Sequence, residues 1–259
     1  LSKRGVAFDY KNPVDLAAVR ELAGEADVLI ENFSPGTVDK LGIGWREMST
    51  INPRLVYCSL SAYGQTGPYC ERSGMDTIIQ AITGTAYVTG HADGPPVMIG
   101  APLADVISGM LAAYSVVSAL HGVKEDNCGR HIDLSMQAAM LYALGPRIAE
   151  YLQAGNVTQR MGSENPLRVP SNIYRAGDGR YAKIHCSNDR RWAALCRIMD
   201  KSEWIDDARF TTMEQRRTHR ADVNAMVAAR FAEKPLDDWL PLFIAHDFPM
   251  APVNDYAQA

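Results

Sequence analysis

The 259-residue sequence lacks the marks of several protein classes. Its five cysteines form no Cys-x-x-Cys pair and no Cys/His cluster with zinc-finger spacing, which argues against a structural zinc site. An odd number of scattered cysteines is typical of reduced thiols, so we expect a cytoplasmic protein. The 26 basic residues do not outnumber the 30 acidic ones, and the formal net charge is -4. Without excess positive charge, we expect no nucleic-acid partner and no binding to an anionic membrane.

Several nucleotide, metal and hydrolase motifs are also absent. Neither Gly-x-Gly-x-x-Gly nor Gly-x-x-x-x-Gly-Lys-Ser/Thr occurs, so an NAD or nucleoside triphosphate site has no support. His-Glu-x-x-His and Gly-x-Ser-x-Gly are missing, and the six histidines are scattered singly, which favours structural roles for them and no metal site. The longest apolar stretch, Val106–Leu120, is expected to be too short to span a bilayer.

The first part of the chain alternates strand and helix patterns. Strands are expected at 5–8, 27–30, 55–59 and 131–134, and helices at 14–23, from Thr37, and at 45–51, 76–81, 103–121 and 137–153. The segment 55–59 is apolar on both faces, which is typical of a parallel sheet. The alternation therefore predicts an α/β fold with a Rossmann-like large domain.

The pattern changes after residue 153. Residues 154–170 are rich in Gly, Asn and Pro, which indicates a linker. Strands at 172–174 and 181–185 and helices at 190–199, 213–231 and 236–246 then predict a smaller α+β domain. We expect a large domain at 1–153, the linker at 154–170 and the small domain at 171–259. The basic groups Arg190–Arg191 and Arg216, Arg217 and Arg220 are expected on solvated helix faces.

Two places could carry chemistry. Asp105 lies at the start of the long apolar helix, where free backbone N–H groups favour a carboxylate. Its position alone favours a capping role over catalysis, although a nucleophilic carboxylate needs the same ionised state and a fixed rotamer. The turn Asn32–Ser34 follows a predicted strand, at the sheet edge where α/β proteins bind ligands. Taken alone, that segment is explained better by a plain strand-to-helix turn.

These segments together resemble one family, the class III (CaiB/BaiF-like) CoA-transferases, which includes formyl-CoA transferase and α-methylacyl-CoA racemases. The resemblance rests on Ala-Asp-Val-Leu-Ile-Glu-Asn-Phe-Ser-Pro-Gly at 26–36, Leu-Gly-Ile-Gly at 41–44, and the stretch from Ile-Asn-Pro-Arg to Gly-Gln-Thr-Gly-Pro at 51–68. It continues at 94–96, 104–105, 129–133, 200–204 and 249–253, and so covers essentially the whole chain. Family subunits are longer at both ends, and the chain begins at Leu1 without Met, so we expect a piece truncated at the N-terminus.

The resemblance implies an activity and a set of site residues. Such an enzyme (EC 2.8.3 type) moves coenzyme A from an acyl-CoA to a small carboxylic acid through an aspartyl mixed anhydride and an aspartyl-CoA thioester, without a metal. The family's nucleophile falls on Asp105. The family's coenzyme A contacts fall on Phe8, Asp9, Tyr10, Lys11, Asn32, Phe33, Ser34 and Lys40, more loosely on Ser73 with Arg72 beside it, and an acidic active-site position falls on Asp76. The resemblance also implies an interlocked homodimer.

Two alternatives stay open, as does the identity of the donor and acceptor acids. A racemase of the same fold would carry Gly-His-Asp with a histidine acid/base, but this sequence has Gly74-Met75-Asp76. Methionine cannot shuttle a proton, which favours the transferase. The other alternative is a non-catalytic homologue that binds coenzyme A.

Overall fold

The computed structural model describes residues 2–259, which form two compact units. One unit comprises the residues up to Thr89 together with Pro96–Gln159, and the other comprises Gly90–Pro95 and Arg160–Ala259. The short loop at 90–95 therefore belongs to the second unit, although it interrupts the sequence of the first.

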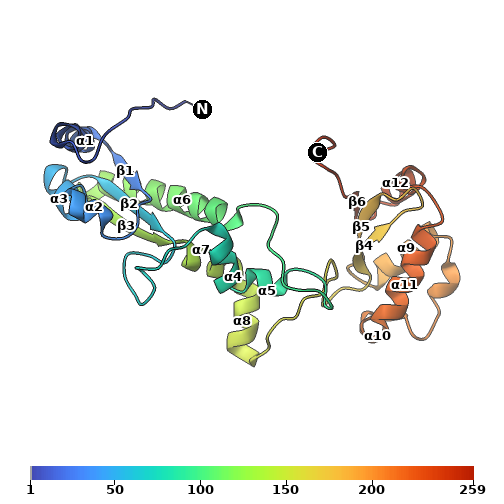
Figure 1. The fold of residues 1–259 in the computed structure, drawn as a ribbon. Helices are drawn as coiled ribbons and strands as arrows, with labels where there is room; N and C mark the ends of the chain where they lie inside the picture. The colour runs from blue at the N-terminus through green and yellow to red at the C-terminus, as the bar shows by residue number, and fades with distance from the viewer. Residues whose placement is uncertain (1) are drawn as a thin grey trace. The chain divides into compact units, whose positions relative to one another are not determined.

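The first unit is built on a parallel sheet of three strands, β1 (Val28–Glu31), β2 (Val56–Ser61) and β3 (Arg130–Ser135), in the order β1-β2-β3 (Figure 1). Nearly every residue of the central strand β2 is buried. A strand covered on both faces needs apolar residues at successive positions, which is why this segment shows no alternation. The α/β class and the parallel sheet are thus confirmed.

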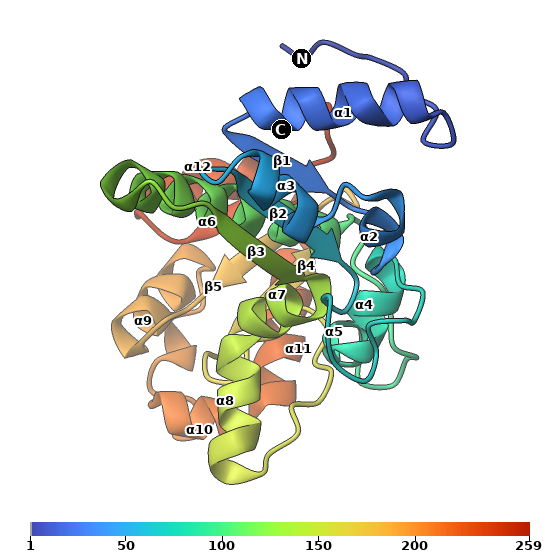
Figure 2. The same cartoon turned by 90° about the vertical axis from the view of Figure 1, so that its left-hand side faces the viewer.

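Helices cover both faces of this sheet (Figure 2). On one face, Leu55 and Tyr57 pack against α1 (Pro13–Glu25), α2 (Thr37–Leu41) and α3 (Trp45–Ile51). On the other, Val56 and Cys58 pack against the long helix α6 (Leu103–Asp126). Because side chains alternate along an extended segment, Leu55, which precedes β2, and the next three residues, which belong to β2, contribute alternately to two separate apolar layers.

The helix α6 buries one side and exposes the other. Its buried residues Ala104, Ser108, Ala112 and Val116 recur every four positions, so they form one face of the helix. The other side carries the exposed apolar stripe, defined by Val106, Met110, Tyr114 and Val117, with exposed fractions of 51%, 68%, 72% and 68%. An apolar stripe of this length is unusual on a surface that faces only water.

By length and composition alone, α6 could cross a membrane. Its most apolar window of 18 residues has a mean hydropathy of 1.7 and is 22% buried. The stretch Val106–Leu120, expected to be too short to span a bilayer, lies within a longer helix of 24 residues, Leu103–Asp126. In the described part of the chain, the helix packs on β2 and β3 with residues that include Ala112, Val116 and Val123.

The remaining helices of the first unit are short. They are α4 (Asp76–Ile82), α5 (Thr85–Val88), α7 (Met136–Ala143) and α8 (Gly145–Ala154). A single helix was expected over 137–153, but the structure breaks it at Leu144, which ends α7 and precedes α8. Gly145 and Pro146 follow this break, and proline is accommodated best at the first turn of a helix.

The segment at 5–8, expected as a strand, forms no strand. Its residues are mostly exposed, Val6 to 70%, and pair with no described part of the sheet. The first ordered backbone contact in this region is the Asp9 N–H, which donates to Asp15 Oδ2 at 2.7 Å. An apolar run becomes a strand only when a neighbouring strand supplies ladder hydrogen bonds, so the residue pattern alone misled the prediction.

The second unit is α+β. An antiparallel sheet in the order β4-β5-β6 combines β4 (Ser171–Arg175), β5 (Tyr181–His185) and β6 (Met250–Pro252). Around it lie α9 (Asp189–Ile198), η1 (Ser202–Trp204), α10 (Met213–Thr218), α11 (Arg220–Phe231) and α12 (Leu236–Ala245). Its core is aromatic, with Trp192, Phe231 and Trp239 fully or almost fully buried.

The helix expected over 213–231 is divided at His219, and β6 was not expected at all.

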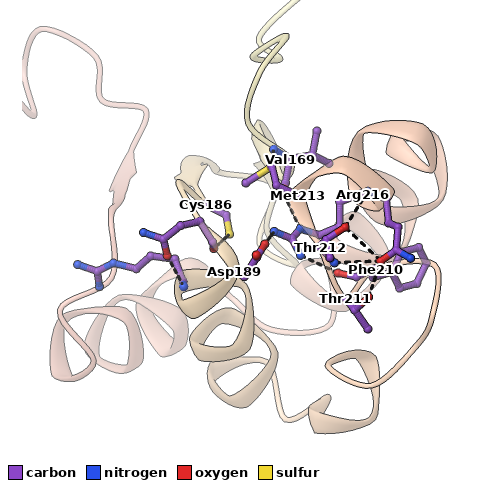
Figure 3. Close-up of polar contacts among 11 residues, drawn as sticks. Val169, Cys186, Asp189, Phe210, Thr211, Thr212, Met213 and Arg216 are labelled. Carbon is purple, nitrogen blue, oxygen red and sulfur yellow. Dashed lines mark hydrogen bonds and ion pairs between the residues drawn. The ribbon is translucent and has the colours of Figure 1, made fainter.

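A buried arginine ties the second unit together (Figure 3). Arg216 is 0% exposed, and its guanidinium donates to the carbonyls of Val169 at 3.0 Å and Phe210 at 2.6 Å and to Asp189 Oδ1 at 2.6 Å. It also lies 5.3 Å from the ring centroid of Trp192. The expectation of a solvated face at Arg216 is wrong, because charge patterning cannot distinguish exposed arginines from one whose donors are all satisfied inside.

Candidate active site

A large cavity of the first unit lies at the carboxyl ends of the parallel strands. It has a volume of about 610 Å³. Asn32–Pro35 follow β1, Ser61–Tyr63 end and follow β2, and Met136 follows β3. The other lining residues are Cys70, Arg72–Thr77 and Asp105. In α/β sheets ligands bind outside this edge, because the loops that leave the strands there converge.

Asp105 lines this cavity from the first turn of α6. Its side chain is exposed, and no described residue donates a side-chain hydrogen bond to its carboxylate. The residue before the helix is Pro102, which has no side chain that could cap the free N–H groups. Asp105 therefore has a carboxylate that remains available to a ligand in the cavity.

The cap of α6 comes from another helix. Asp76 Oδ1 accepts the N–H groups of Ala104 at 2.7 Å and Asp105 at 3.4 Å, while Asp76 Oδ2 accepts Gln80 Nε2 at 2.7 Å. The carboxylate thus satisfies N–H groups at the positive end of the helix dipole. Asp76 and Asp105 both line the cavity, but Asp76 is occupied by protein donors and Asp105 is not.

The turn after β1 is fixed by its own side chains. Glu31 is 6% exposed, and its Oε2 accepts the Phe33 N–H at 2.8 Å. Asn32 Nδ2 donates to the Leu60 carbonyl at 2.6 Å, which ties the turn to β2. The amide of Asn32 therefore offers only its oxygen, and one free N–H position, to a ligand. Gly36 ends the turn at φ 76°, in the left-handed region that glycine tolerates.

Arg72 supplies positive charge to the lining of the cavity. Its guanidinium lies 4.0 Å from the ring centroid of Tyr69, and Ser73 follows it in the lining. A guanidinium stacked on an aromatic face keeps its planar donors free at the edge, where they suit phosphate or carboxylate oxygens.

The structure does not bring every predicted residue to the cavity. Asn32, Phe33, Ser34, Arg72, Ser73, Asp76 and Asp105 line it, whereas Phe8, Asp9, Tyr10, Lys11 and Lys40 do not. Tyr10 nevertheless contacts the turn, with its ring 5.7 Å from that of Phe33 in an edge-to-face arrangement. Lys40 is exposed on α2.

Other residues of the site were not anticipated. Tyr63, Cys70 and Met136 line the cavity, and Gln80 and Glu31 hold its elements in place. One signal was present in the sequence: Gln80 follows Asp76 by four residues, a spacing that brings two side chains together on a helix. The lining residues on loops had no comparable signal, since a loop's path follows from tertiary contacts.

A second cavity of the first unit, about 530 Å³, is lined in part by His131. His131 stacks on Trp45 with ring centroids 5.5 Å apart, and its Nε2 lies 3.0 Å from Ser59 Oγ. Burial lowers the pKa of His131 below its ordinary value of 6.5, although Asp133, Glu31 and Asp39 partly oppose this. Neither this histidine nor any other in the described chain lines the cavity that holds Asp105.

Among residues 2–259, no three His, Cys, Asp or Glu side chains are grouped so that they could hold a metal ion. The polar groups that line this cavity include the carboxylates of Asp76 and Asp105, the Arg72 guanidinium, the Asn32 amide, and hydroxyls of serine, threonine and tyrosine side chains. Such a set can hold an anionic ligand and present one free carboxylate to it.

Comparisons with known proteins agree with this geometry. The sequence model of CoA-transferase family III matches residues 1–259. The chain is 34% identical over 254 residues to an acyl-CoA transferase from Fusarium pseudograminearum, covering 98% of this chain and 56% of the relative. It is 30% identical over 254 residues to the succinyl-CoA:glutarate CoA-transferase of Homo sapiens, covering 98% and 58%. It is 33% identical over 258 residues to the acetyl-CoA:oxalate CoA-transferase of Acetobacter aceti, covering 99% and 66%.

A solved structure is also similar. A CAIB/BAIF family protein from Brucella suis superimposes with a TM-score of 0.90 at 34% identity, covering 99% of this chain and 68% of that chain. The chain spans 56% to 66% of the length of the curated relatives named above. From the match over its whole length, this chain belongs to CoA-transferase family III.

Proposed function

We propose that the protein transfers coenzyme A from an acyl-CoA thioester to a carboxylic acid, with Asp105 as the nucleophile. The observation that carries the proposal is the contrast between two carboxylates in one cavity. Asp76 is held by backbone and amide donors, whereas Asp105 faces the cavity without a described side-chain donor. A nucleophile must have its lone pairs free, so only Asp105 meets this requirement.

The reaction would proceed in two symmetric halves. An Asp105 oxygen attacks the thioester carbonyl, the C–S bond breaks, and a mixed anhydride and the coenzyme A thiolate result. The thiolate then attacks the Asp105 carbonyl carbon, which releases the donor acid and leaves an aspartyl-CoA thioester. The acceptor carboxylate reverses these two steps and regenerates Asp105. The covalent route divides one unfavourable exchange between a carboxylate and a thioester into easier steps.

The surrounding residues suit such a substrate. The Arg72 guanidinium can pair with phosphate or carboxylate oxygens, and the Phe33 ring offers an apolar face beside it. The turn at Asn32–Ser34 is anchored to β2 and to Glu31, so it can contact a ligand without first becoming ordered. Phe8–Lys11 and Lys40, outside the cavity lining, are proposed to contact more distant parts of coenzyme A.

The acids are proposed from the relatives. Proteins similar to this chain are named for succinyl-CoA with glutarate, for acetyl-CoA with oxalate, and for succinyl-CoA with D-citramalate. We therefore propose small dicarboxylic acids as the exchange partners. A panel of succinyl-CoA and acetyl-CoA against glutarate, oxalate, malate and citramalate, with new thioesters separated by chromatography, would identify the pair.

We also infer that the protein acts as a homodimer in which a second copy covers the exposed apolar stripe of α6. Four large apolar side chains that are each more than half exposed support this, because such stripes usually mark association surfaces. The family resemblance implies interlocked subunits of the same kind.

The experiment uses the full-length protein and succinyl-CoA. Hydroxylamine added during turnover converts an activated aspartyl group to a hydroxamate, and mass spectrometry maps the modified residue. We expect the modification on Asp105, and no transfer by an Asp105→Ala variant. Glu125→Gln, which changes an exposed carboxylate near the other end of α6, is the matched control and should leave both results unchanged.

Transfer at the normal rate by Asp105→Ala would refute the proposal. Exchange of the α-proton of an acyl-CoA in deuterated water, without any acceptor acid, would instead identify a racemase. Binding of acyl-CoA with neither reaction would identify a non-catalytic homologue.

A further inference from the structure

Gln80 is a completely buried amide that hydrogen-bonds on both of its ends. It is 0% exposed and lies on α4, four residues after Asp76. Its Nε2 donates to Asp76 Oδ2 at 2.7 Å and to the Ala101 carbonyl at 3.3 Å, and its Oε1 accepts the Ile99 N–H at 2.9 Å. A buried amide whose donors and acceptor are all used fixes the groups around it, because losing any one partner leaves a polar atom unsatisfied.

The partners of Gln80 are the elements that start α6. Ile99 and Ala101 belong to the turn that enters the helix, and Asp76 holds the N–H groups of Ala104 and Asp105. Gly100 lies within this turn at 99–101, and Pro102, which follows the turn as the N-cap residue of α6, provides no side-chain cap. The turn and the first turn of α6 are therefore held by α4, through one amide and one carboxylate.

We propose that Gln80 is a positioning residue for the transfer reaction. It fixes the turn at 99–101 and the rotamer of Asp76, and thereby sets where α6 begins and where the Asp105 carboxylate lies in the cavity. This inference rests on the proposed role of Asp105 as the nucleophile. Gln80 does not line the cavity, so it acts on the reaction only through Asp76 and the backbone.

The expected effect is on the chemical step. A nucleophile displaced by about 1 Å can lose about 100-fold in rate even when the substrate still binds. Gln80→Leu keeps a similar size and removes all three hydrogen bonds. We expect its kcat with succinyl-CoA and glutarate, or with the most active pair of the panel, to fall about 100-fold, while KM for the acyl-CoA changes less than about threefold.

A matched control separates positioning from general weakening. Thr83→Val removes a buried hydroxyl at the end of the same helix, where Thr83 Oγ1 donates to the Ile79 carbonyl at 2.6 Å and lies 3.5 Å from the Gln80 carbonyl and 3.1 Å from Thr85 Oγ1. Thr83 makes no hydrogen bond to the turn at 99–101 or to the side chain of Gln80. We expect a loss of thermal stability comparable to that of Gln80→Leu and a kcat near that of the unchanged protein.

A second variant serves if Gln80→Leu does not fold. Gln80→Glu keeps the acceptor for Ile99, but its added carboxyl group can donate to Asp76 only when it is protonated. The titratable groups that face this position are Asp76 and, beyond it on α6, Asp105. Burial and the nearby Asp76 carboxylate both raise the pKa of the added group. The kcat of Gln80→Glu, relative to that of the unchanged protein, should therefore increase as the pH is lowered.

The outcomes distinguish the two proposals. If Asp105→Ala abolishes transfer but Gln80→Leu and Gln80→Glu keep full kcat at every pH, the positioning role is refuted and the nucleophile stands. If Thr83→Val loses as much kcat as Gln80→Leu, the effect is general weakening and the positioning role is refuted as well. If Asp105→Ala retains transfer, the proposed function itself fails.

Discussion

The buried guanidinium of Arg216 allows a quantitative prediction for the second unit. Arg216→Ala would leave the carbonyls of Val169 and Phe210 without their donor in a buried environment. Each unsatisfied carbonyl costs about 1–3 kcal/mol, and a further cost comes from the space left against Trp192. The variant no longer has to bury the guanidinium charge, and the desolvation cost that is avoided offsets part of this loss of stability. We therefore expect the free energy of unfolding to fall by about 3–5 kcal/mol.

The opposite half of the ion pair should matter much less. Asp189 is 57% exposed, so water can solvate its carboxylate or a replacement amide. Asp189→Asn also keeps an oxygen that can accept from Arg216, so we expect a loss below about 1 kcal/mol. By this reasoning, the hydrogen bonds from Arg216 to the two carbonyls contribute more to stability than its ion pair with Asp189 does.

Urea unfolding followed by tryptophan fluorescence measures this asymmetry in the full-length protein. Trp192, Trp204 and Trp239 all belong to the second unit, so its transition dominates the signal. Arg216→Met, which fills most of the space without a charge, should lie between the other two variants because it creates a smaller cavity. Equal losses for Asp189→Asn and Arg216→Ala would show that the reasoning from buried carbonyls is wrong.

Three further predictions follow from the first unit. Desolvation lowers the pKa of His131 below 6.5, so the imidazole binds a proton more readily in the unfolded chain, and the stability of the folded protein falls as the pH drops below 6.5. His131→Gln should flatten this part of a stability–pH curve. An unchanged slope in the variant would contradict the prediction. Gly129→Ala would place a Cβ 2.4 Å from the Leu55 carbonyl oxygen and should lower the free energy of unfolding, measured in urea, by about 1–3 kcal/mol. Gly122→Ala, whose Cβ would lie 3.7 Å from the Arg130 side chain, should leave the free energy of unfolding almost unchanged. Met110→Glu with Tyr114→Glu should convert a dimer to monomers in light scattering without loss of helix content, and an unchanged mass would show that the stripe is not the dimer surface.

The sequence was sufficient to predict the parallel sheet. The segment Leu55–Cys58 is apolar at successive positions and is completely buried, so local pattern and burial agree there. The prediction failed where tertiary contacts decide. Residues 5–8 have a strand-like composition but no strand to pair with, and Gly145-Pro146 breaks a helix whose apolar periodicity continues across it.

The candidate site was predictable only in its outline. The position of Asn32 after a strand predicted a site at that edge of the sheet, the family resemblance added Asp105, and the structure places both in the lining of one cavity. That Asp76 caps the helix of Asp105 could not be read from the sequence, because Asp76 and Ala104 are 28 positions apart and the chain between them follows a path set by the fold. Arg216 shows the same limit, since the adjacent Arg217 has the same charge and is exposed.

The most direct test of the central claim follows a single oxygen atom. With ¹⁸O in both carboxylate oxygens of the acceptor acid, the proposed sequence leaves one labelled oxygen on Asp105 after transfer, and the next turnover passes it to the released donor acid. We predict ¹⁸O in the peptide that contains Asp105 after one turnover and in the donor acid after several. Label that stays wholly in the acceptor and its thioester, with none on Asp105, would contradict the account.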